Sequence, residues 1–240
     1  MCSSDLLVSI YPFLECISFW ERVILPGFGL LLSAMFPVRW INDPRSTAAL
    51  ASGGYILLRR AVWEGLGGYE SIRAEMIDDL NTARLVKHSG HRIFVTASKD
   101  LLRTRMYHNF REIWEGLRKN AFAGHRFSIP KMIATTGTYL LANLLPLVCL
   151  LFYAWSWSNG RTDVPPAIFA LSLAQYGVAV VLHLPLIVHL QINPVYALLA
   201  PLGAILYAAI CIDSTARTLL GKGVSWKLRQ YGKPRVAPEN

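Results

Sequence analysis

MIATTGTYLLANLLPLVCLLFYAWSW, residues 132–157, is a run without a single charged side chain. About 20 apolar residues at the helical rise of about 1.5 Å cross a hydrocarbon core of about 30 Å, so this run is long enough to span a membrane. Two further apolar runs follow it, residues 167–190 and 195–212, and turn-forming residues separate the three. The sequence therefore predicts a transmembrane α-helical block over residues 132–216.

The composition of the chain supports this interpretation. Hydrophobic residues make up 53% of the chain and charged residues 16%, against about 25% charged in a typical soluble domain. Arg161, Asp163 and Asp213 are the only charged residues between positions 132 and 216. Such a segment excludes a disordered chain, because it must bury its surface. Buried helices of a soluble protein are the alternative, but they would need a polar shell that this chain lacks, so we expect a lipid bilayer as partner.

Two other classes of protein are excluded. The four cysteines, Cys2, Cys16, Cys149 and Cys211, are scattered, so we expect reduced thiols rather than a disulfide-stapled secreted domain. The N-terminus lacks the basic region of a secretory signal. The net charge of +9 would also suit nucleic-acid binding, but this charge flanks the apolar block and no nucleic-acid-binding module is present. We therefore expect no nucleic acid among the partners.

The basic residues predict the orientation of the block. Eight Lys and Arg precede it in residues 99–131 and six follow it in residues 217–240, whereas the loop 158–166 has one. Both flanks should therefore be cytoplasmic, which requires an even number of crossings. Three apolar runs conflict with that, so two or three spans remain open, and the Pro-interrupted stretch His183–His189 is a candidate for a re-entrant segment.

The chain divides into three regions. Residues 1–131 are the polar part, 132–216 the apolar block, and 217–240 a basic cytoplasmic tail whose Trp226 and Tyr231 should lie on the inner leaflet. The polar part has an α/β pattern. Its predicted elements are a strand at 55–58, a helix at 61–66, a helix at 78–88 and a strand at 92–96.

Two further segments are apolar enough to lie on a membrane surface. In residues 110–122 the apolar side chains share one helical face, which predicts an interfacial helix; a helix packed on a protein core is the alternative. Residues 6–36 are interrupted by Glu15, Glu21 and Arg22. They predict a surface hairpin with its bend at Pro26-Gly27, and a span is the alternative.

Asp78 and Asp79 begin the predicted helix 78–88. Acidic residues in a first turn complement the helix dipole by about 0.3 to 1 kcal/mol and cap free N–H groups, and for the pair alone this is the simpler interpretation. Two carboxylates at a rigid helix start can also do chemistry, with one pointing inward and the other holding the backbone or a cation.

The residues around this pair form an ordered set. Its central part comprises Gly53-Gly54, Arg59-Arg60, Gly67-Gly68-Tyr69, Asp78-Asp79-Leu80, Arg84 and Gly90. Four flanking segments also belong to the set, namely Phe19-Trp20-Glu21-Arg22, Val38–Pro44, Arg105-Met106-Tyr107 and Trp226-Lys227. It resembles the C-terminal half of the catalytic domain of membrane-bound family 2 glycosyltransferases, in the branch of ceramide glucosyltransferase-like and hopanoid-associated enzymes.

The resemblance implies an incomplete GT-A-type domain followed by the transmembrane helices. It implies inverting transfer of a sugar from a nucleotide-sugar donor to a lipid-linked hydroxyl, the lipid acceptor, at the cytoplasmic face of the cell membrane. The family's acidic pair matches Asp78-Asp79, so Asp79 would be the general base and Asp78 a second catalytic residue. Gly53, Gly54 and Arg59 would bind substrate.

The family pattern is incomplete in this chain. Arg111 would bind substrate as the counterpart of the arginine in the family's Gln-x-x-Arg-Trp element, but Glu112 stands where Trp is expected. The family holds a divalent metal, Mg or Mn, with an Asp-x-Asp motif, and no such motif occurs here. We therefore expect no metal ligands in this chain, which would be the acceptor-side half of such an enzyme and inactive alone. It would be a truncated or mis-started gene product, a half that needs a nucleotide-binding partner, or a decayed relative.

Two other functions stay open. A non-catalytic membrane scaffold or lipid-binding protein derived from such an enzyme would keep the same residues without the reaction. A small transporter would fit the apolar block but leaves residues 53–90 unexplained.

Overall fold

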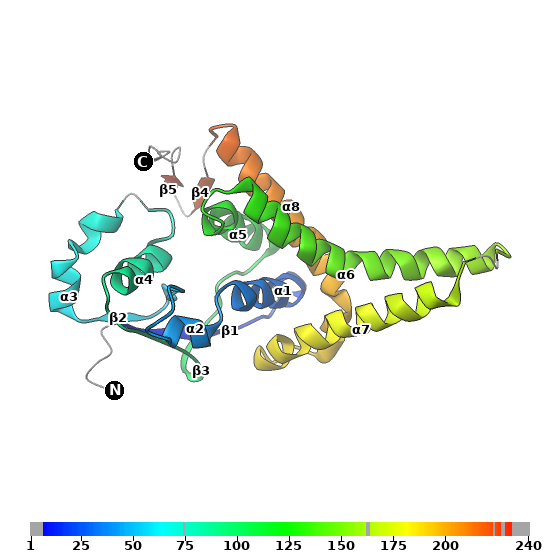
Figure 1. Ribbon diagram of the computed structural model, residues 1–240, viewed down its shortest axis with the longest axis horizontal. Coiled ribbons are helices and arrows are strands. Elements are labelled where there is room, and N and C mark those ends of the chain that lie inside the picture. The colour runs from blue at the N-terminus through cyan, green and yellow to red at the C-terminus, as the bar shows by residue number, and fades with distance from the viewer. Residues whose placement is uncertain (1–6, 74, 162–163, 223, 227–228, 232–240) are drawn as a thin grey trace. The chain divides into compact units, whose positions relative to one another are not determined.

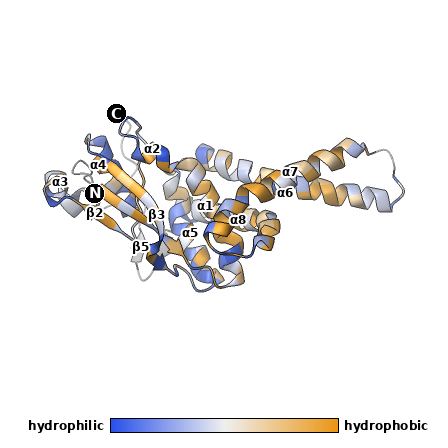
Figure 2. Ribbon diagram, turned by 90° about the horizontal axis from the view of Figure 1, so that it is seen from below, coloured by the Kyte–Doolittle hydropathy of each residue, from blue (hydrophilic) through white to orange (hydrophobic). Residues whose placement is uncertain are grey.

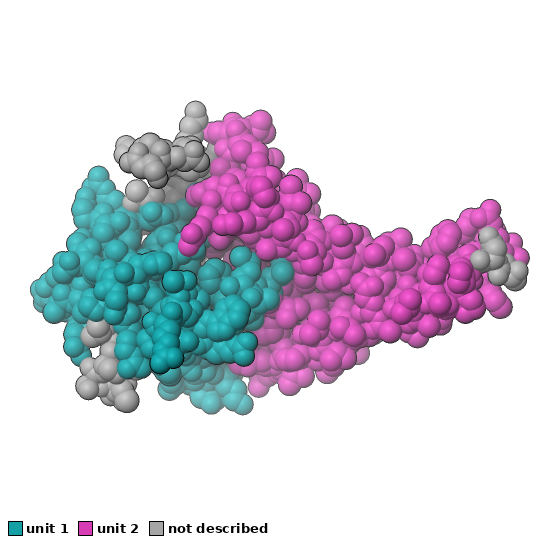
Figure 3. Space-filling view, viewed as in Figure 1, with its two compact units in different colours: residues 1–15, 31–106 teal, residues 16–30, 107–240 magenta. Residues whose placement is uncertain are grey.

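The computed structural model describes residues 7–73, 75–161, 164–222, 224–226 and 229–231, and Figure 1 labels its elements. Helices dominate, together with a small three-stranded sheet, so the mixed α/β class is confirmed. The chain forms two compact units, coloured separately in Figure 3. Unit 1 comprises residues 1–15 and 31–106, and unit 2 comprises residues 16–30 and 107–240.

Unit 1 contains the three-stranded sheet, with strand order β2-β1-β3. The central strand β1 (Leu7–Leu14) is antiparallel to β2 (Ile56–Leu58) and parallel to β3 (Ile93–Thr104). Pro12 has no N–H to donate to a strand ladder, and the register of β1 against β3 shifts directly after it. The predicted strands at 55–58 and 92–96 are confirmed, the second as the beginning of a longer strand.

Four short helices complete unit 1. They are α2 (Val38–Asn42), α3 (Arg60–Gly65), the 3₁₀-helix η1 (Gly68–Ile72) and α4 (Asp78–His88). The predicted helices at 61–66 and 78–88 are confirmed as α3 and α4. The apolar face of α4 packs with the sheet and α2 into one core, made of Leu7, Ile41, Ala49, Leu50, Ala51, Leu80, Ala83, Val86, Ile93 and Val95.

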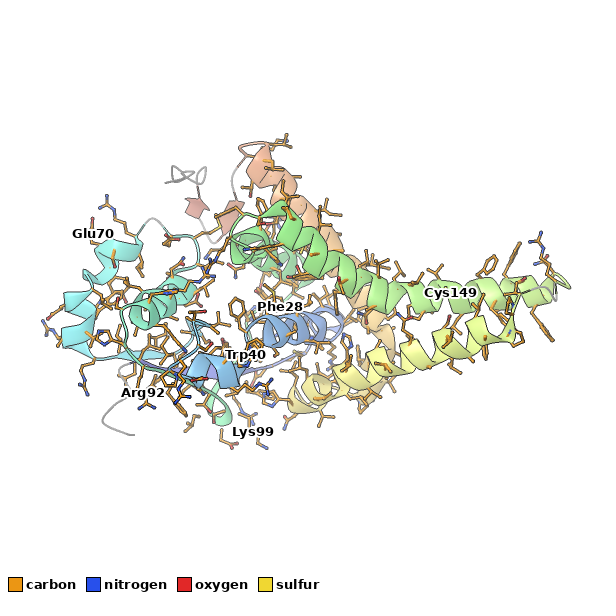
Figure 4. All side chains as sticks on the ribbon, viewed as in Figure 1. Phe28, Trp40, Glu70, Arg92, Lys99 and Cys149 are labelled. Atoms are coloured by element: carbon orange, nitrogen blue, oxygen red, sulfur yellow. The ribbon has the colours of Figure 1, made fainter. Side chains whose placement is uncertain are left out.

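Two polar side chains fix α2 within unit 1. The Asn42 amide donates to the Val95 carbonyl at 2.8 Å and accepts from the Val95 N–H at 2.7 Å, so it pairs with β3 as a neighbouring strand would. The buried Lys87 ammonium donates to carbonyl groups at the end of α2, those of Trp40 (labelled in Figure 4), Ile41 and Asp43. These bonds satisfy carbonyls that a helix end leaves without partners.

The segment 7–36 differs from its prediction. Residues 7–14 form β1, and α1 (Phe19–Met35) continues through Pro26 as one helix, so the predicted surface hairpin with a bend at Pro26-Gly27 is wrong. Glu21, one of the charged residues that led to this prediction, is buried for a structural reason. The buried Glu21 carboxylate accepts the N–H groups of Ile17 and Ser18 at 3.2 and 2.6 Å, and it thereby caps the start of α1.

The apolar block of unit 2 consists of α6 (Ile129–Ser158), α7 (Pro166–His189), the 3₁₀-helix η2 (Pro194–Leu199) and α8 (Ala200–Leu219). Three of its helical stretches, α6, α7 and η2 with α8, are long and apolar enough to cross a membrane, which confirms the predicted apolar helices and leaves their crossing of a membrane a prediction. Figure 2 shows apolar residues along α6 and α7. α7 continues as one helix through Pro185.

The helix α5 (Phe110–Gly124) confirms the predicted amphipathic helix at 110–122. Its apolar residues Ile113, Leu117 and Ala121 are buried, and α5 packs against α8. The structure thus agrees with the alternative interpretation, in which protein covers this face.

After α8, the short strands β4 (Val224–Trp226) and β5 (Arg229–Tyr231) pair antiparallel. Lys227 and residues 232–240 of the predicted membrane-binding tail lie outside the described residues.

The structure describes three cysteines, and none of the three forms a disulfide. Cys16 and Cys149 are half-buried and Cys211 is buried. Figure 4 labels Cys149 on α6. Cys2 lies outside the described residues.

Candidate functional site

A cavity of about 640 Å³ opens in unit 1 between β2, the loop before it, α3, η1 and the start of α4. Four of the predicted site residues line it, namely Gly53, Gly54, Asp78 and Asp79. The aromatic residues Tyr55, Trp63 and Tyr69 line it as well. The structure therefore brings together the glycine pair and the acidic pair, which lie apart in the sequence.

The loop that carries the glycine pair is tied to the central strand. The buried Ser9 hydroxyl donates to the Tyr55 carbonyl at 2.9 Å and accepts from the Ser52 N–H at 2.8 Å. Both ends of the loop 52–55 therefore bond to one side chain of β1, which holds the Gly53 and Gly54 backbone at the cavity wall.

The Asp79 carboxylate bonds to the backbone on both of its oxygens. Its Oδ2 accepts the Gly53 N–H at 2.9 Å, and its Oδ1 accepts the Leu80 N–H at 2.7 Å. A Cβ at Gly53 would stand 3.1 Å from this Oδ2, so the close approach favours glycine there. Asp79 thus connects the start of α4 to the glycine loop.

Asp78 has a different environment from its neighbour. Its side chain is exposed at the cavity, and among the described residues its carboxylate makes no hydrogen bond or ion pair. The Thr82 hydroxyl donates to its backbone carbonyl at 2.7 Å. Because Asp78 is in the first turn of α4, the helix dipole stabilises its negative charge. Asp78 is therefore the member of the pair whose oxygens can accept hydrogen bonds from a ligand.

An aromatic pair stands on the same cavity. The rings of Trp63 and Tyr69 meet edge to face with 5.0 Å between their centroids, and Tyr69 is 76% exposed. Gly67 and Gly68 have positive φ angles of 87° and 59°, which L-residues with a side chain rarely adopt. This turn brings η1, where Glu70 is labelled in Figure 4, back beside α3.

Tyr11 of β1 has a buried hydroxyl group without a hydrogen-bond partner among the described residues. Burial raises the pKa of Tyr11 well above its ordinary value, and the negative charge of Asp79 raises it further. Tyr11 therefore stays protonated at neutral pH.

The two predicted arginines lie elsewhere. Arg59 precedes α3, and the arginine that lines the cavity is its neighbour Arg60, which pairs with Glu64 at 2.7 Å. Arg111 belongs to α5 in unit 2, where it is exposed and pairs with Glu115 at 2.9 Å. Hydrogen bonding to Glu115 raises the pKa of Arg111.

The residues around Arg111 form a helix cap. The Asn109 side chain accepts the Glu112 N–H at 3.0 Å, and the Glu112 carboxylate accepts the His108 N–H at 2.9 Å. These two bonds resemble a capping box, which explains Glu112 at the position where the family pattern has Trp. The hydrogen bonds from His108 lower the pKa of Glu112.

Among the described residues, no three His, Cys, Asp or Glu side chains lie close enough together to hold a metal ion. No step proposed below uses a metal.

Sequence analysis missed Trp63 and Tyr69 as site residues. The signal for them was the glycine pair Gly67-Gly68, whose turn brings the two rings together. Comparison of the chain with protein-family models, with curated proteins and with solved structures finds no match.

Proposed function

We propose that the cavity of unit 1 binds a sugar, and that the chain contributes the acceptor side of a glycosyltransferase that acts on membrane lipids. The observation that carries this proposal is that Asp78, whose carboxylate is exposed, and the exposed ring of Tyr69 line the same cavity. Sugars present apolar C–H faces that pack on aromatic rings and hydroxyl groups that donate to carboxylates.

The reaction would be transfer from a nucleotide-sugar donor to a lipid-linked hydroxyl. The acceptor oxygen attacks the anomeric carbon and forms the new glycosidic bond, while the bond from that carbon to the diphosphate breaks and its electron pair leaves with the diphosphate. The acceptor proton passes to a carboxylate of the acidic pair. Unit 2 supplies the apolar helices that would keep the chain at the membrane, where such an acceptor is found.

The geometry suggests a division of roles within the pair. Asp79 as general base stays a prediction, and its two backbone hydrogen bonds favour a role in holding the glycine loop. Asp78 is exposed at the cavity and is the second candidate for the base. We place this site on the cytoplasmic side, because the basic flanks of the apolar block favour that orientation.

A binding titration tests the proposal on the full chain in lipid nanodiscs. Octyl glycosides of different hexoses combine a sugar with an alkyl chain and are followed through tryptophan fluorescence. We expect one hexose to bind, Tyr69→Ala to weaken it at least tenfold, and Asp78→Asn to weaken it as well. Glu70→Gln is the matched control, because Glu70 pairs with Arg73 in solvent and does not line the cavity. Equal affinities for all four proteins would contradict the proposal.

The alternative is a non-catalytic membrane protein that keeps remnants of the fold. The observation that favours it is that both oxygens of the Asp79 carboxylate already accept hydrogen bonds from backbone N–H groups. This function predicts that neither Tyr69→Ala nor Asp78→Asn changes any binding property of the chain.

A further inference from the structure

The apolar helices of unit 2 differ in how far protein covers them. In the most apolar window of α6 and of α7, 17% of the residues are buried, against 50% in the stretch of η2 and α8. α6 and α7 expose large apolar side chains along their length, among them Leu141, Leu151, Leu171 and Val181. α8 exposes only Ile205, Ile212 and Leu219 as large apolar residues, and their spacing of seven puts them on one stripe.

α6 and α7 form a complete antiparallel hairpin. Near its open end the Tyr139 hydroxyl donates to His183 Nε2 at 3.0 Å, because the other ring nitrogen of His183 donates to the Ala179 carbonyl. Near the closed end the rings of Tyr153 and Phe169 stand 5.1 Å apart. The exposed apolar residues of α7 extend from Ile168 to Val188, about 30 Å at the helical rise, which matches the hydrocarbon thickness.

After α7 the chain turns back along this helix. The Tyr176 hydroxyl donates to the Leu198 carbonyl at 2.7 Å, and Tyr176 is near the middle of α7. The part of α7 between Tyr176 and its end at His189 is about 20 Å long. By the end of η2, therefore, the chain has returned to the level of mid-α7.

α8 then runs in the opposite direction to α6. Tyr207 meets Tyr139 with 6.4 Å between ring centroids, and the Thr215 hydroxyl donates to the Met132 sulfur at 3.9 Å. As α8 advances by two turns, its partner on α6 moves back toward the start of α6 at Ile129. Figure 1 shows α8 leaving the middle of the α6–α7 pair toward α5.

The end of α8 carries charges that meet α5. Asp213 accepts from Trp114 Nε1 at 2.8 Å and from the Arg118 guanidinium at 3.2 Å, and it pairs with Arg217 at 2.9 Å. The Ser214 hydroxyl donates to the Arg118 carbonyl at 2.7 Å. Because α5 directly precedes α6, these charges lie at the end of the block where α6 begins.

We infer that lipid acyl chains surround α6 and α7 as the two membrane crossings, and that η2 with α8 is a re-entrant segment that enters and leaves on the same side. A backbone outside a regular α-helix is tolerated at membrane depth where other parts of the protein bury it. The Tyr176 hydroxyl donates a hydrogen bond to the Leu198 carbonyl of η2. α8 approaches α1 so closely that a Cβ at Gly203 would stand 2.6 Å from the Val23 carbonyl oxygen.

This topology resolves the conflict in the charge pattern. Two crossings leave the basic residues 99–131 and 217–240 on one side of the membrane and the loop after α6 on the other. The re-entrant segment is 190–219 rather than the stretch around Pro185 that the sequence suggested.

Site-directed labelling in intact cells tests the inference. The native cysteines are replaced, and a single cysteine is introduced as Ser128→Cys before α6, Ser158→Cys at the end of α6, or Lys222→Cys after α8. A membrane-impermeant maleimide is applied before and after permeabilisation. We expect Ser128→Cys and Lys222→Cys to react on the same side and Ser158→Cys on the opposite side, with a difference in labelling of at least tenfold.

Two results would overturn the inference. Labelling of Lys222→Cys on the same side as Ser158→Cys would mean three crossings, and labelling of all three cysteines on one side would mean none. If the cysteine-free protein is not produced, reporter domains fused after Ser158 and after Lys222 of the unchanged sequence give the same comparison. Equal reporter activity at the two fusions contradicts two crossings.

Discussion

Replacement of Asp79 by alanine should loosen the glycine loop of unit 1. The change removes the acceptors of two backbone N–H groups, those of Gly53 and Leu80. Only the Gly53 bond joins the loop to α4, because the Leu80 bond lies within the helix start. A hydrogen bond to a charged group contributes about 1.5 to 3 kcal/mol, and we take about 1.5 kcal/mol because Gly53 is exposed and its N–H can bond to water instead. A loss of about 1.5 kcal/mol corresponds to a roughly 12-fold change in the equilibrium for opening the loop.

Amide hydrogen exchange followed by mass spectrometry measures this opening directly. In Asp79→Ala, a peptide that contains Gly53 should exchange roughly 12-fold faster than in the unchanged protein. Asp78→Ala is the matched control, because its carboxylate makes no hydrogen bond among the described residues and contributes about 0.3 to 1 kcal/mol through the helix dipole. The loop should then exchange less than about fivefold faster. Equal effects of the two substitutions would refute the division of roles within the pair.

Three further predictions concern other parts of the chain. Gly67→Ala places a side chain on a backbone with a φ of 87° and should lower the free energy of unfolding by about 1 to 2 kcal/mol, which thermal unfolding measures. It should also weaken glycoside binding in the fluorescence titration. Unchanged values of both would contradict the role of this turn. Burial, with the nearby Glu21 charge, raises the pKa of Cys16 to about 12. Alkylation of this thiol at pH 8 should therefore be roughly 100-fold slower than alkylation of the free amino acid cysteine, as followed by peptide mass spectrometry. An alkylation rate equal to that of the amino acid would count against the burial of Cys16. Asp213→Asn leaves the buried Arg118 without its charge partner and should destabilise unit 2 by about 3 kcal/mol in thermal unfolding. The control Lys222→Gln, at an exposed position after α8, should change the stability little. Similar melting temperatures for the two variants would argue against the ion pair.

The sequence predicted elements whose signals are local. Asp78-Asp79 at the start and Gly90 after the end bound α4, and both signals depend only on helix termini. The scarcity of charge in 132–216, where Arg161, Asp163 and Asp213 are the only charged residues, likewise predicts apolar helices without any tertiary information.

The sequence could not predict features that depend on distant partners. β1 contains Pro12, and it is a strand because β2 and β3 pair with it from both sides. Glu21 argued against burial until its role as a helix cap was visible. The same holds in the site, where the division between Asp78 and Asp79 depends on the Gly53 loop, and the aromatic pair depends on the turn at Gly67.

The most direct test of the central proposal is photolabelling of the full chain in nanodiscs. The probe is an alkyl glycoside with a diazirine on the sugar, and the labelled peptides are identified by mass spectrometry. We predict labelling of peptides that contain Trp63, Tyr69 or Asp78, and its suppression by an excess of the same glycoside without the diazirine. Labelling confined to α6 and α7, or labelling that the excess does not suppress, would contradict a sugar site in the cavity of unit 1.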